Sequence, residues 1–268
     1  MDLQLSGKRA LVTGSSAGIG AGIAKSLARE GTSVVVHGRN KERTESVVKE
    51  IAQSGAKAAS AVGDLGTDEG AQSVVEQALA QIGGIDILVN NAGVFPDSTW
   101  METSSDDWLQ TYNLNVVSAA RMIRLLVPAM KEQGWGRIIQ MSSSAAVEPL
   151  GNHPNYTGSK AAMLNMTVSL IRKELKDTGI TVNTVSPGVI ITQGVRELFY
   201  NLAKQYGWGD DWESVIKGAQ KDFLSNPTGR YGTPEDVGDL VAFLVSPRAG
   251  YINGANYRID GGSTPTIN

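Results

Sequence analysis

A tyrosine and a lysine stand four residues apart, at Tyr156 and Lys160, and this spacing suits proton transfer. Residues at i and i+4 share one face of a helix, and this pair opens the apolar-periodic segment 161–175. A free tyrosine has a pKa of about 10, so a neighbouring ammonium that stabilises the phenolate is expected to bring that pKa towards neutrality. The pattern predicts Tyr156 as a general acid and base. In the alternative, Tyr156 is a partly buried aromatic residue and Lys160 a surface residue of the helix.

Ser143 lies just behind the apolar segment 137–141 and thirteen residues before Tyr156. Parallel α/β sheets bind ligands at the carboxyl ends of their strands, so we expect the Ser143 hydroxyl to hydrogen-bond a substrate oxygen there. Such chemistry needs neither thiol nor metal, and the chain has no Cys and only two His, His37 and His153. These counts exclude a disulfide framework, a zinc ribbon and a thiol nucleophile, and no metal site is expected.

A glycine-rich run, Gly14-x-x-x-Gly18-x-Gly20, follows the first β-branched segment and opens an amphipathic one. In this position Gly14 allows a tight turn, Gly18 lets the backbone approach the pyrophosphate of a dinucleotide, and Gly20 permits close helix–strand packing. The spacing differs from the general Gly-x-Gly-x-x-Gly fingerprint. On this motif alone, a glycine-rich turn without a ligand is the alternative.

The residues after the second apolar segment bear on the type of cofactor. NAD-binding folds commonly place a carboxylate about 20 residues beyond the glycine motif, where it binds the ribose, whereas an arginine accommodates a 2′-phosphate. This chain has Gly38 at the expected acidic position and Arg39 next to it. A guanidinium can bind a phosphate through two hydrogen bonds, so the sequence favours NADP(H), with NAD(H) possible. A solvated surface arginine is the alternative.

The candidate site residues follow short strand-like segments, which indicates an α/β fold. Such segments alternate with longer amphipathic ones, which is typical of a parallel sheet covered on both faces. Helical spacing predicts a helix over 18–29, and the stretch 104–131 is long enough for a helix of many turns. The expected fold is a single doubly wound, Rossmann-like domain over 1–268 with a seven-stranded parallel sheet. Its predicted strands are 9–13, 33–37, 58–62, 85–90, 137–141, 181–186 and 255–259.

Length and charge narrow the class of protein. The 268 residues suit one α/β domain, and 24 Lys and Arg against 27 Asp and Glu give a net charge of −3 without a long run of either sign. No nucleic-acid partner is therefore expected. The first residues are typical of a mature protein, and no apolar stretch approaches the roughly 18 residues that span a bilayer. We expect a soluble, cytoplasmic protein that acts on a small molecule.

Together these motifs resemble those of the short-chain dehydrogenase/reductase family, over about residues 5–262. The resemblance implies a catalytic tetrad of Asn115, Ser143, Tyr156 and Lys160. It rests on Thr13, Gly14, Gly18, Gly20, Asp64, Leu65, the run 90–93, Asn115, Ser143, Tyr156, Lys160, Asn183, Pro187, Gly188, Thr192 and the run 260–262. The cofactor contacts that it implies are Gly14, Ser16, Gly18, Ile19, Gly20, Arg39, Asp64, Leu65, Asn91, Ala92, Gly93, Tyr156, Lys160, Pro187, Gly188, Ile190 and Thr192.

The resemblance also implies roles. In carbonyl reduction Tyr156 would protonate the developing alkoxide while the nicotinamide delivers a hydride. Lys160 would also bind the nicotinamide ribose, and Asn115 would hold a water that links Lys160 to solvent. Asp64 and Leu65 would border the adenine.

Further contacts follow from the same resemblance. Residues 91–93 would line the cofactor groove, and Ile190 and Thr192 would hold the carboxamide. Many NADP-preferring members carry a second basic residue just before the middle glycine, where this chain has Ala17. Arg39 is then the one evident partner for a 2′-phosphate.

Residues 193–226 interrupt the alternation, and in this family the corresponding element is a variable helical flap over the substrate. The flap holds six aromatic residues, namely Phe199, Tyr200, Tyr206, Trp208, Trp212 and Phe223. They could cover an apolar or ring-containing carbonyl compound, or they could pack the flap helices onto the body or another subunit. His153 either contacts substrate at the mouth of the cleft or has a role in its loop.

The favoured function is an oxidoreductase that transfers a hydride between NADP(H) and a carbonyl or secondary-alcohol substrate. One alternative is an NAD-dependent secondary-alcohol, polyol or sugar dehydrogenase, and another is a cofactor-sensing protein without turnover. The resemblance further implies a homotetramer built through the long helices over 104–131 and 155–176 and through the C-terminal region.

Overall fold

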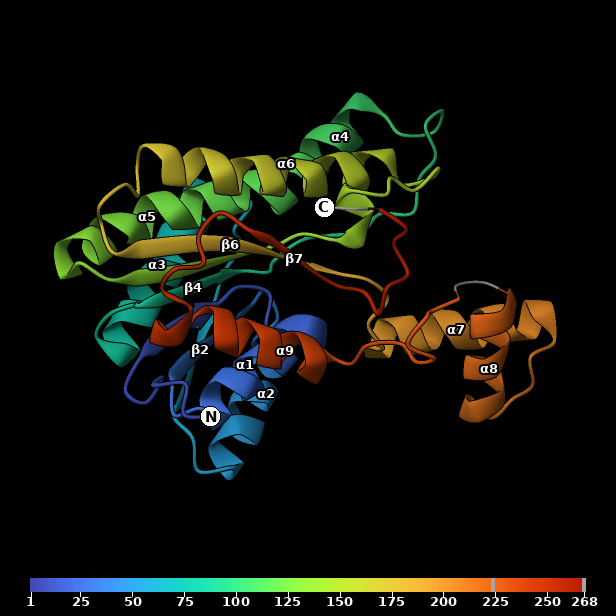
Figure 1. Ribbon diagram of the computed structural model, residues 1–268, viewed down its shortest axis with the longest axis horizontal. Helices are drawn as coiled ribbons and strands as arrows, with labels where there is room; N and C mark the ends of the chain where they lie inside the picture. Colours follow the sequence, from blue (N-terminus) through green and yellow to red (C-terminus); the bar gives the residue numbers. More distant parts are fainter. Residues whose placement is uncertain (223–224, 267–268) are drawn as a thin grey trace.

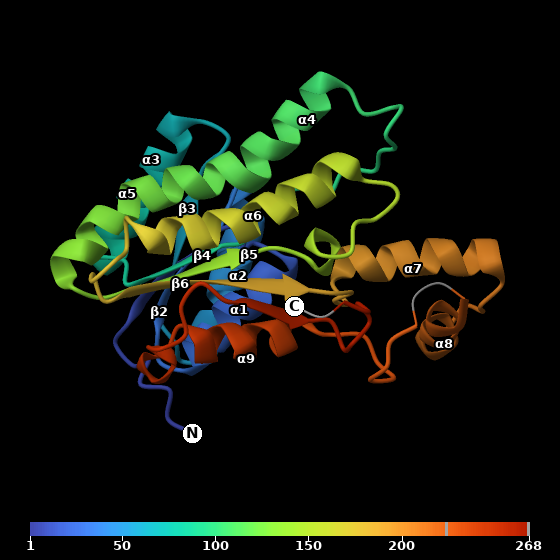
Figure 2. The same ribbon diagram turned by 45° about the horizontal axis from the view of Figure 1, so that its top comes forward.

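The computed structural model describes residues 1–222 and 225–266. Its centre is a seven-stranded parallel sheet in the order β3-β2-β1-β4-β5-β6-β7, covered by helices on both faces (Figures 1 and 2). The strands are β1 (Arg9–Val12), β2 (Ser33–Gly38), β3 (Ala58–Val62), β4 (Ile87–Asn90), β5 (Gly136–Met141), β6 (Ile180–Pro187) and β7 (Asn256–Ile259). The predicted Rossmann-like fold class is confirmed, and every predicted strand forms with ends shifted by two residues or fewer.

Each face of the sheet has its own hydrophobic layer. Helices α1 (Gly18–Arg29), α2 (Lys41–Gln53) and α9 (Pro234–Leu244) cover one face, and α3 (Asp68–Ile82), α5 (Ser118–Gln133) and α6 (Pro154–Arg172) cover the other. Alternate residues of β1 divide between the layers, since Ala10 and Val12 pack with α1 whereas Leu11 packs with α3. This alternation along the apolar residues 10–12 buries the strand on both sides of the sheet.

The predicted helix over 104–131 is interrupted. A helix α4 (Ser105–Tyr112), capped by Ser104 and Asp107, passes into a π-helical turn over Asn113–Val117 and then into α5. The wider turn re-aims the side chains between the two helices, and π-turns of this kind are frequent at functional sites. Hydrophobic spacing does not reveal a local change of this size, so the sequence showed only one long helix.

The segment predicted as a flap forms helices α7 (Gln193–Tyr206) and α8 (Trp212–Asp222), which project from the body (Figure 2). Their aromatic side chains pack mainly on one another. Phe199 and Trp208 are buried in a small core with Ala203, Val215, Ala219 and Tyr231, whereas Tyr206 is exposed and stacks on Trp208. Phe199 and Trp208 thus pack within the segment itself and against Tyr231 of its return, a packing that neither expectation described, and Phe223 lies outside the described residues.

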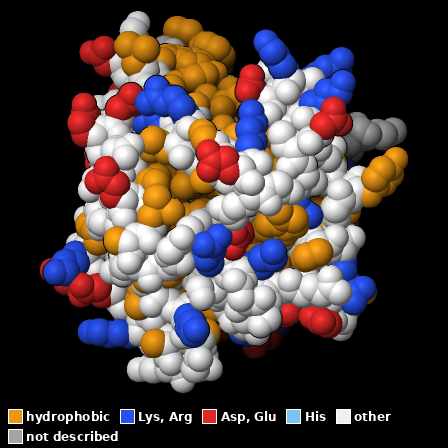
Figure 3. All heavy atoms as spheres, turned by 90° about the vertical axis from the view of Figure 1, so that its left-hand side faces the viewer, with side chains coloured by type: hydrophobic (Ala, Val, Ile, Leu, Met, Phe, Trp, Pro, Cys, Tyr) orange, Lys and Arg blue, Asp and Glu red, His pale blue; other side chains and the backbone are white. Residues whose placement is uncertain are grey.

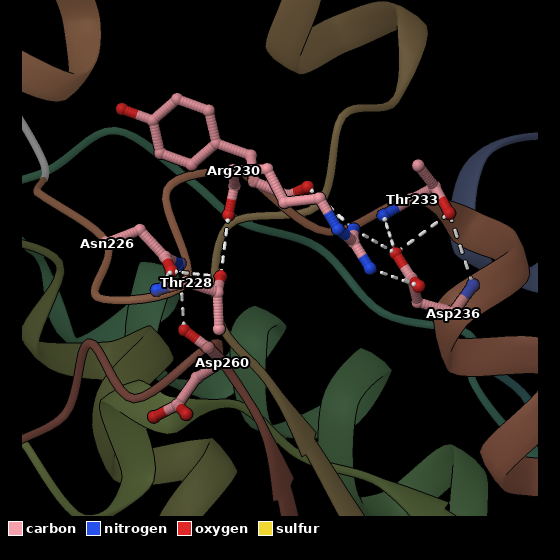
Figure 4. A network of polar contacts seen from close by, with 7 residues as sticks. Asn226, Thr228, Arg230, Thr233, Asp236 and Asp260 are labelled. Atoms are coloured by element: carbon pink, nitrogen blue, oxygen red, sulfur yellow. Dashed lines mark hydrogen bonds and ion pairs between the residues drawn. The ribbon is translucent and has the colours of Figure 1, made fainter.

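The return from the flap is held by a polar network (Figure 4). Arg230 donates two hydrogen bonds of 2.6 and 2.7 Å to Asp236, and Asp236 also accepts the backbone N–H of Thr233 in the capping box of α9. Asn226 donates to the carbonyl oxygen of Asp260 at the end of β7. The network attaches the flap's return segment to both α9 and the sheet.

Along the described chain, every helix is too short or too polar to cross a bilayer.

Candidate active site

A cavity of about 180 Å³ lies at the carboxyl ends of β1, β2, β3 and β4. The strand order reverses between β1 and β4, which is where open α/β sheets bind their ligands. Seven of the predicted cofactor residues line the cavity, namely Gly14, Ser16, Arg39, Asp64, Leu65, Ala92 and Gly93. The other lining residues, His37, Gly38, Val94 and Leu114, were not predicted as contacts, because only the fold brings them to this edge.

The glycine-rich loop is interlocked with the segment after β4. Gly14 has φ +64°, and a Cβ atom there would lie 2.8 Å from Ala92 Cα. Asn91 Nδ2 donates to the carbonyl oxygens of Thr13 and Gly14, and a side chain at Gly20 would collide with that amide at 2.5 Å. The structure thus uses the Asn91 side chain to hold the loop, and Asn91 is not a lining residue of the cavity.

The loop also approaches the segment after β6. Gly18 has φ +58°, and a Cβ atom there would touch Thr192 Cγ2 at 3.4 Å. Gly188 packs against Asp260, where a Cβ atom would lie 2.8 Å from its Cβ, and buried Ile190 bridges to Gly232. These predicted residues, with Pro187 at the end of β6 and Ile19 in α1, do not line the nucleotide cavity.

The start of α1 fits the pyrophosphate of a dinucleotide. Ala17 occupies the N-cap and offers no side-chain acceptor, so no cap hydrogen bond covers the first amide groups of the helix. Free amide groups and the helix dipole favour an anion at that place. The chain itself therefore carries the left-handed glycines, the cavity and the uncapped helix that a bound dinucleotide needs.

Ser143, Tyr156 and Lys160 meet beyond the carboxyl end of β5. Lys160 is buried, and its Nζ donates to the carbonyl oxygen of Met141 at 3.0 Å. Burial raises the pKa of Tyr156 above its ordinary value, and a hydrogen bond with the Ser143 hydroxyl opposes that shift. Burial lowers the pKa of Lys160 to about 8.

The direction of the Tyr156 shift differs from the expectation that Lys160 would bring the tyrosine pKa towards neutrality. Lys160 Nζ lies 5.7 Å from the centre of the Tyr156 ring, and desolvation disfavours the charged form of both groups. The residues of the chain thus keep Tyr156 protonated at neutral pH.

Asn115 projects from the π-helical turn and is buried. Its Nδ2 donates to the carbonyl oxygen of Val94 and to Ser159 Oγ, and its Oδ1 accepts the Val94 N–H at 2.7 Å. Asn115 therefore ties the segment after β4 to α6. Both Nδ2 hydrogens are engaged, so a water would have to use the remaining lone pair of Oδ1 or the backbone.

Gly93 connects the two halves of the site. It lines the nucleotide cavity, and a Cβ atom there would lie 2.8 Å from Asn115 Oδ1 and 3.6 Å from Lys160 Nζ. Any side chain at this position would push against the tetrad. Gly93 therefore places the nucleotide cavity directly beside Asn115 and Lys160.

Phe95 is a site residue that sequence reasoning missed. Phe95 is 56% exposed. Its ring meets the Tyr156 ring edge to face with 4.6 Å between ring centres, and the centre of the His153 ring lies 4.4 Å away. His153 Nδ1 lies 2.9 Å from the Pro96 carbonyl oxygen, so His153 is buried and holds the loop after β4. The loop interpretation of His153 is the one that this geometry supports, and Phe95 presents the aromatic surface to solvent beside Tyr156.

His37 is the second missed residue. Its Nδ1 accepts the Gly14 N–H at 3.0 Å, and its Nε2 lies 3.2 Å from the Gly63 carbonyl oxygen. Burial lowers the pKa of His37 to about 4. A neutral ring with its hydrogen on Nε2 satisfies both contacts, so His37 links the glycine-rich loop to β2 and to the segment after β3.

Comparison with known proteins gives the same assignment over nearly the whole chain. The model of the short chain dehydrogenase family matches residues 8–202. The 3-oxoacyl-[acyl-carrier-protein] reductase FabG of Aquifex aeolicus is 35% identical over 263 residues, which are 98% of this chain and 99% of that protein.

Two solved structures are similar over their full length. L-sorbose reductase from Gluconobacter frateurii, complexed with NADPH and L-sorbose, is 36% identical with a TM-score of 0.92, covering 100% of both chains. A 7α-hydroxysteroid dehydrogenase complexed with NADH and 7-oxo glycochenodeoxycholic acid is 30% identical with a TM-score of 0.85, covering 100% of this chain and 98% of that one. The chain belongs to the short-chain dehydrogenase/reductase family of NAD(P)-dependent oxidoreductases that act on carbonyl and alcohol groups.

Proposed function

We propose that this protein is an NADP(H)-dependent reductase of a ketone, an oxoacyl group or a similar carbonyl, with Tyr156 as its general acid. The observation that carries the proposal is the position of Gly93, which lines the nucleotide cavity and also lies against Asn115 and Lys160. Residues that line the cavity, among them Gly14, Arg39 and Gly93, would hold the nicotinamide cofactor, which would supply the hydride. The similarity to L-sorbose reductase complexed with NADPH supports the same assignment.

A bound nicotinamide cofactor supplies the hydride in reduction and accepts it in oxidation. The Tyr156 hydroxyl donates its proton to the substrate oxygen as the carbonyl carbon gains the hydride, and the Ser143 hydroxyl hydrogen-bonds the same oxygen. Protonated Tyr156 is the form that reduction requires, and the raised pKa favours this form. The charged Lys160 then stabilises the phenolate that remains.

The proposed preference for NADP(H) rests on Arg39. Its side chain lines the nucleotide cavity, and Gly38 before it places no carboxylate near the ribose. Dissociation constants for NADPH and NADH, measured by fluorescence titration on the wild type and on Arg39→Asp, test this preference. We expect tighter NADPH binding in the wild type and a reversal in the variant, and a wild type that prefers NADH contradicts the assignment.

A keto-sugar or polyol substrate is the second candidate, because the structure of L-sorbose reductase matches over the full chain with a TM-score of 0.92. An NAD-dependent dehydrogenase of such a substrate stays the alternative in the oxidative direction. A panel of ketones, oxoacyl esters, quinones and keto-sugars, monitored by NADPH oxidation, separates the substrate classes. A cofactor-sensing protein would turn over none of them.

Two further proposals concern the surroundings of the site. Helices α7 and α8 serve as the flap over the substrate, and the face formed by α5 and α6 serves as a subunit interface in a homotetramer. A groove between α5 and α6 is lined by Ala120, Ile123, Met166 and Leu170 among others. Figure 3 shows hydrophobic side chains gathered near the top of the molecule. The cytoplasmic location stays a prediction.

The role of Tyr156 is tested by Tyr156→Phe. We expect a loss of turnover of at least about 100-fold, the usual contribution of a positioned acid, with the dissociation constant for NADPH unchanged within twofold. Stopped-flow measurement of NADPH oxidation gives the first quantity, and fluorescence titration gives the second. A variant that reduces the same carbonyl at the wild-type rate removes Tyr156 from the mechanism.

A further inference from the structure

A second groove lies on the other side of the glycine-rich loop, between α1, α2 and the start of α7. We call it the outer groove; its lining includes Ser16, Ala17, Gly18, Lys25, Arg43, Glu50, Thr192 and Glu197. Ser16 lines both this groove and the nucleotide cavity, where it lies with Arg39. The Ser16 hydroxyl therefore marks the place where the two spaces meet.

The space around Gly38 limits which side chain fits beside Ser16. A Cβ atom on Gly38 would lie 2.6 Å from both Ser16 Oγ and Thr44 Oγ1. Thr44 is fully buried, and its hydroxyl donates to the carbonyl oxygen of Asn40 at 2.7 Å, so it has little freedom to move. A side chain that carries a carboxylate has no room here, and the Ser16 hydroxyl occupies the space as a hydrogen-bond donor.

Arg43 belongs to the lining of the outer groove. It stands in the first turn of α2, where its backbone N–H donates to the Asn40 cap at 2.9 Å. The helix buries Thr44, Val47 and Ile51, whereas Arg43 is exposed and lines the outer groove.

Some charged side chains around the outer groove have an ion-pair or hydrogen-bond partner, and others do not. Lys25 lies 2.6 Å from Glu50, and Glu197 accepts a hydrogen bond from Gln193. Within the described chain, the side chains of Arg39 and Arg43 have no ion pair or hydrogen bond. One arginine without such a partner thus lines each of the two spaces that share Ser16, Arg39 in the nucleotide cavity and Arg43 in the outer groove.

We propose that Arg43 is a second 2′-phosphate-binding residue, which acts from the opposite side to Arg39 and supplies the positive charge that Ala17 does not. The proposal rests on the proposed preference for NADP(H). A phosphate monoester carries a charge of roughly −1.5 to −2 at neutral pH, and guanidinium groups bind it through paired, charge-assisted hydrogen bonds. A ribose with a free 2′-hydroxyl has no such charge, so the contribution of Arg43 is confined to NADPH.

The test compares Arg43→Gln with Arg39→Gln, the double variant and Lys41→Gln. Lys41 lies in the same helical turn and loses the same charge, but its ammonium faces Glu45 at 3.8 Å and does not line either space. Calorimetry measures binding of adenosine 2′,5′-bisphosphate and of AMP, which differ only in the 2′-phosphate, and fluorescence titration measures NADPH and NADH. Thermal unfolding of each variant shows that the fold is retained.

We expect Arg43→Gln to weaken NADPH and adenosine 2′,5′-bisphosphate about tenfold, which is the size of one hydrogen-bonded charge pair. Binding of NADH and AMP should stay within about twofold, as should every ligand of Lys41→Gln. An equal loss for both cofactors, an equal loss in Lys41→Gln, or no loss for NADPH in Arg43→Gln overturns the role of Arg43. A wild type that prefers NADH overturns the proposed cofactor instead, so the two failures are distinguishable.

Discussion

At the residue scale, burial controls the protonation of the groups that surround the site. Tyr156 and Lys160 are both shifted towards their neutral forms, because a desolvated charge is costly in either case. Neutral Tyr156 is ready to donate a proton. Neutral Lys160, by contrast, would no longer stabilise the phenolate.

This difference predicts the pH dependence of carbonyl reduction. The pKa of Lys160 is lowered to about 8, so the Lys160 side chain is positively charged below that pH and neutral above it. We expect kcat/KM for reduction to fall as the pH rises through about 8. The limb should move to higher pH in Lys160→Arg, because a guanidinium stays protonated. If kcat/KM of the wild type stays constant up to pH 9.5, about one and a half pH units above that pKa, the prediction is contradicted.

His37 predicts a pH dependence of stability. Its pKa is lowered from 6.5 to about 4 in the fold, so the ring is neutral in both folded and unfolded chains above pH 6.5. As the pH falls from 6.5 towards 4, the unfolded chain takes up the proton first and stability is lost. Since one pKa unit corresponds to about 1.4 kcal/mol, the loss approaches about 3 kcal/mol.

Urea unfolding of the wild type and of His37→Gln at several pH values measures this loss. Other groups titrate in the same window, so the informative quantity is the difference in unfolding free energy between the two proteins. That difference should shrink as the pH falls, because glutamine keeps a donor and an acceptor but takes up no proton. A difference that is independent of pH would remove His37 as the cause.

At the element scale, two irregular features position the site. The π-helical turn between α4 and α5 directs Asn115 to Val94 and Ser159, and the left-handed backbone of His153 starts α6 at Pro154. Neither has a marker in hydrophobic spacing. The tetrad residues were identified from their motifs, while the way in which they are held could not be predicted.

The polar network of the flap return gives an element-scale prediction. In Asp236→Ala the capping box of α9 and both hydrogen bonds from Arg230 are lost. We expect a loss of about 1 kcal/mol from the cap, which lowers the melting temperature by roughly 2–4 °C in a protein of this size. Hydrogen exchange over 226–232 should become faster. Glu235→Ala removes the neighbouring charge, but Glu235 takes no part in the capping box. It should leave the melting temperature and the hydrogen exchange unchanged. If Glu235→Ala changes them as much as Asp236→Ala does, the role of the network is contradicted.

At the scale of the whole molecule, the nucleotide cavity and the surface proposed as a subunit interface lie in different parts of the fold. The nucleotide cavity lies at the carboxyl ends of the strands, and the surface of α5 and α6 has a groove lined in part by apolar residues. The proposed tetramer would cover that groove.

Sedimentation equilibrium tests the assembly. We expect the wild type to be a tetramer and Ala120→Glu, which adds a charge to the groove without removing a core side chain, to form smaller species. Leu79→Glu places the same charge on an exposed position of α3 and should leave the tetramer intact. A monomeric wild type, or dissociation in both variants, argues against this interface.

The sequence by itself determined the family, the parallel sheet and the residue types of the site, because glycine turns, strand periodicity and the Tyr156 to Lys160 spacing are local properties of the chain. The tertiary structure alone decided which groups are desolvated and which are placed together across long sequence separations. It joined Gly93 to Lys160, set His37 under the glycine-rich loop, laid Phe95 on Tyr156 and turned the flap aromatics towards one another. Burial and close contact depend on the packing of distant elements, and no local pattern encodes them.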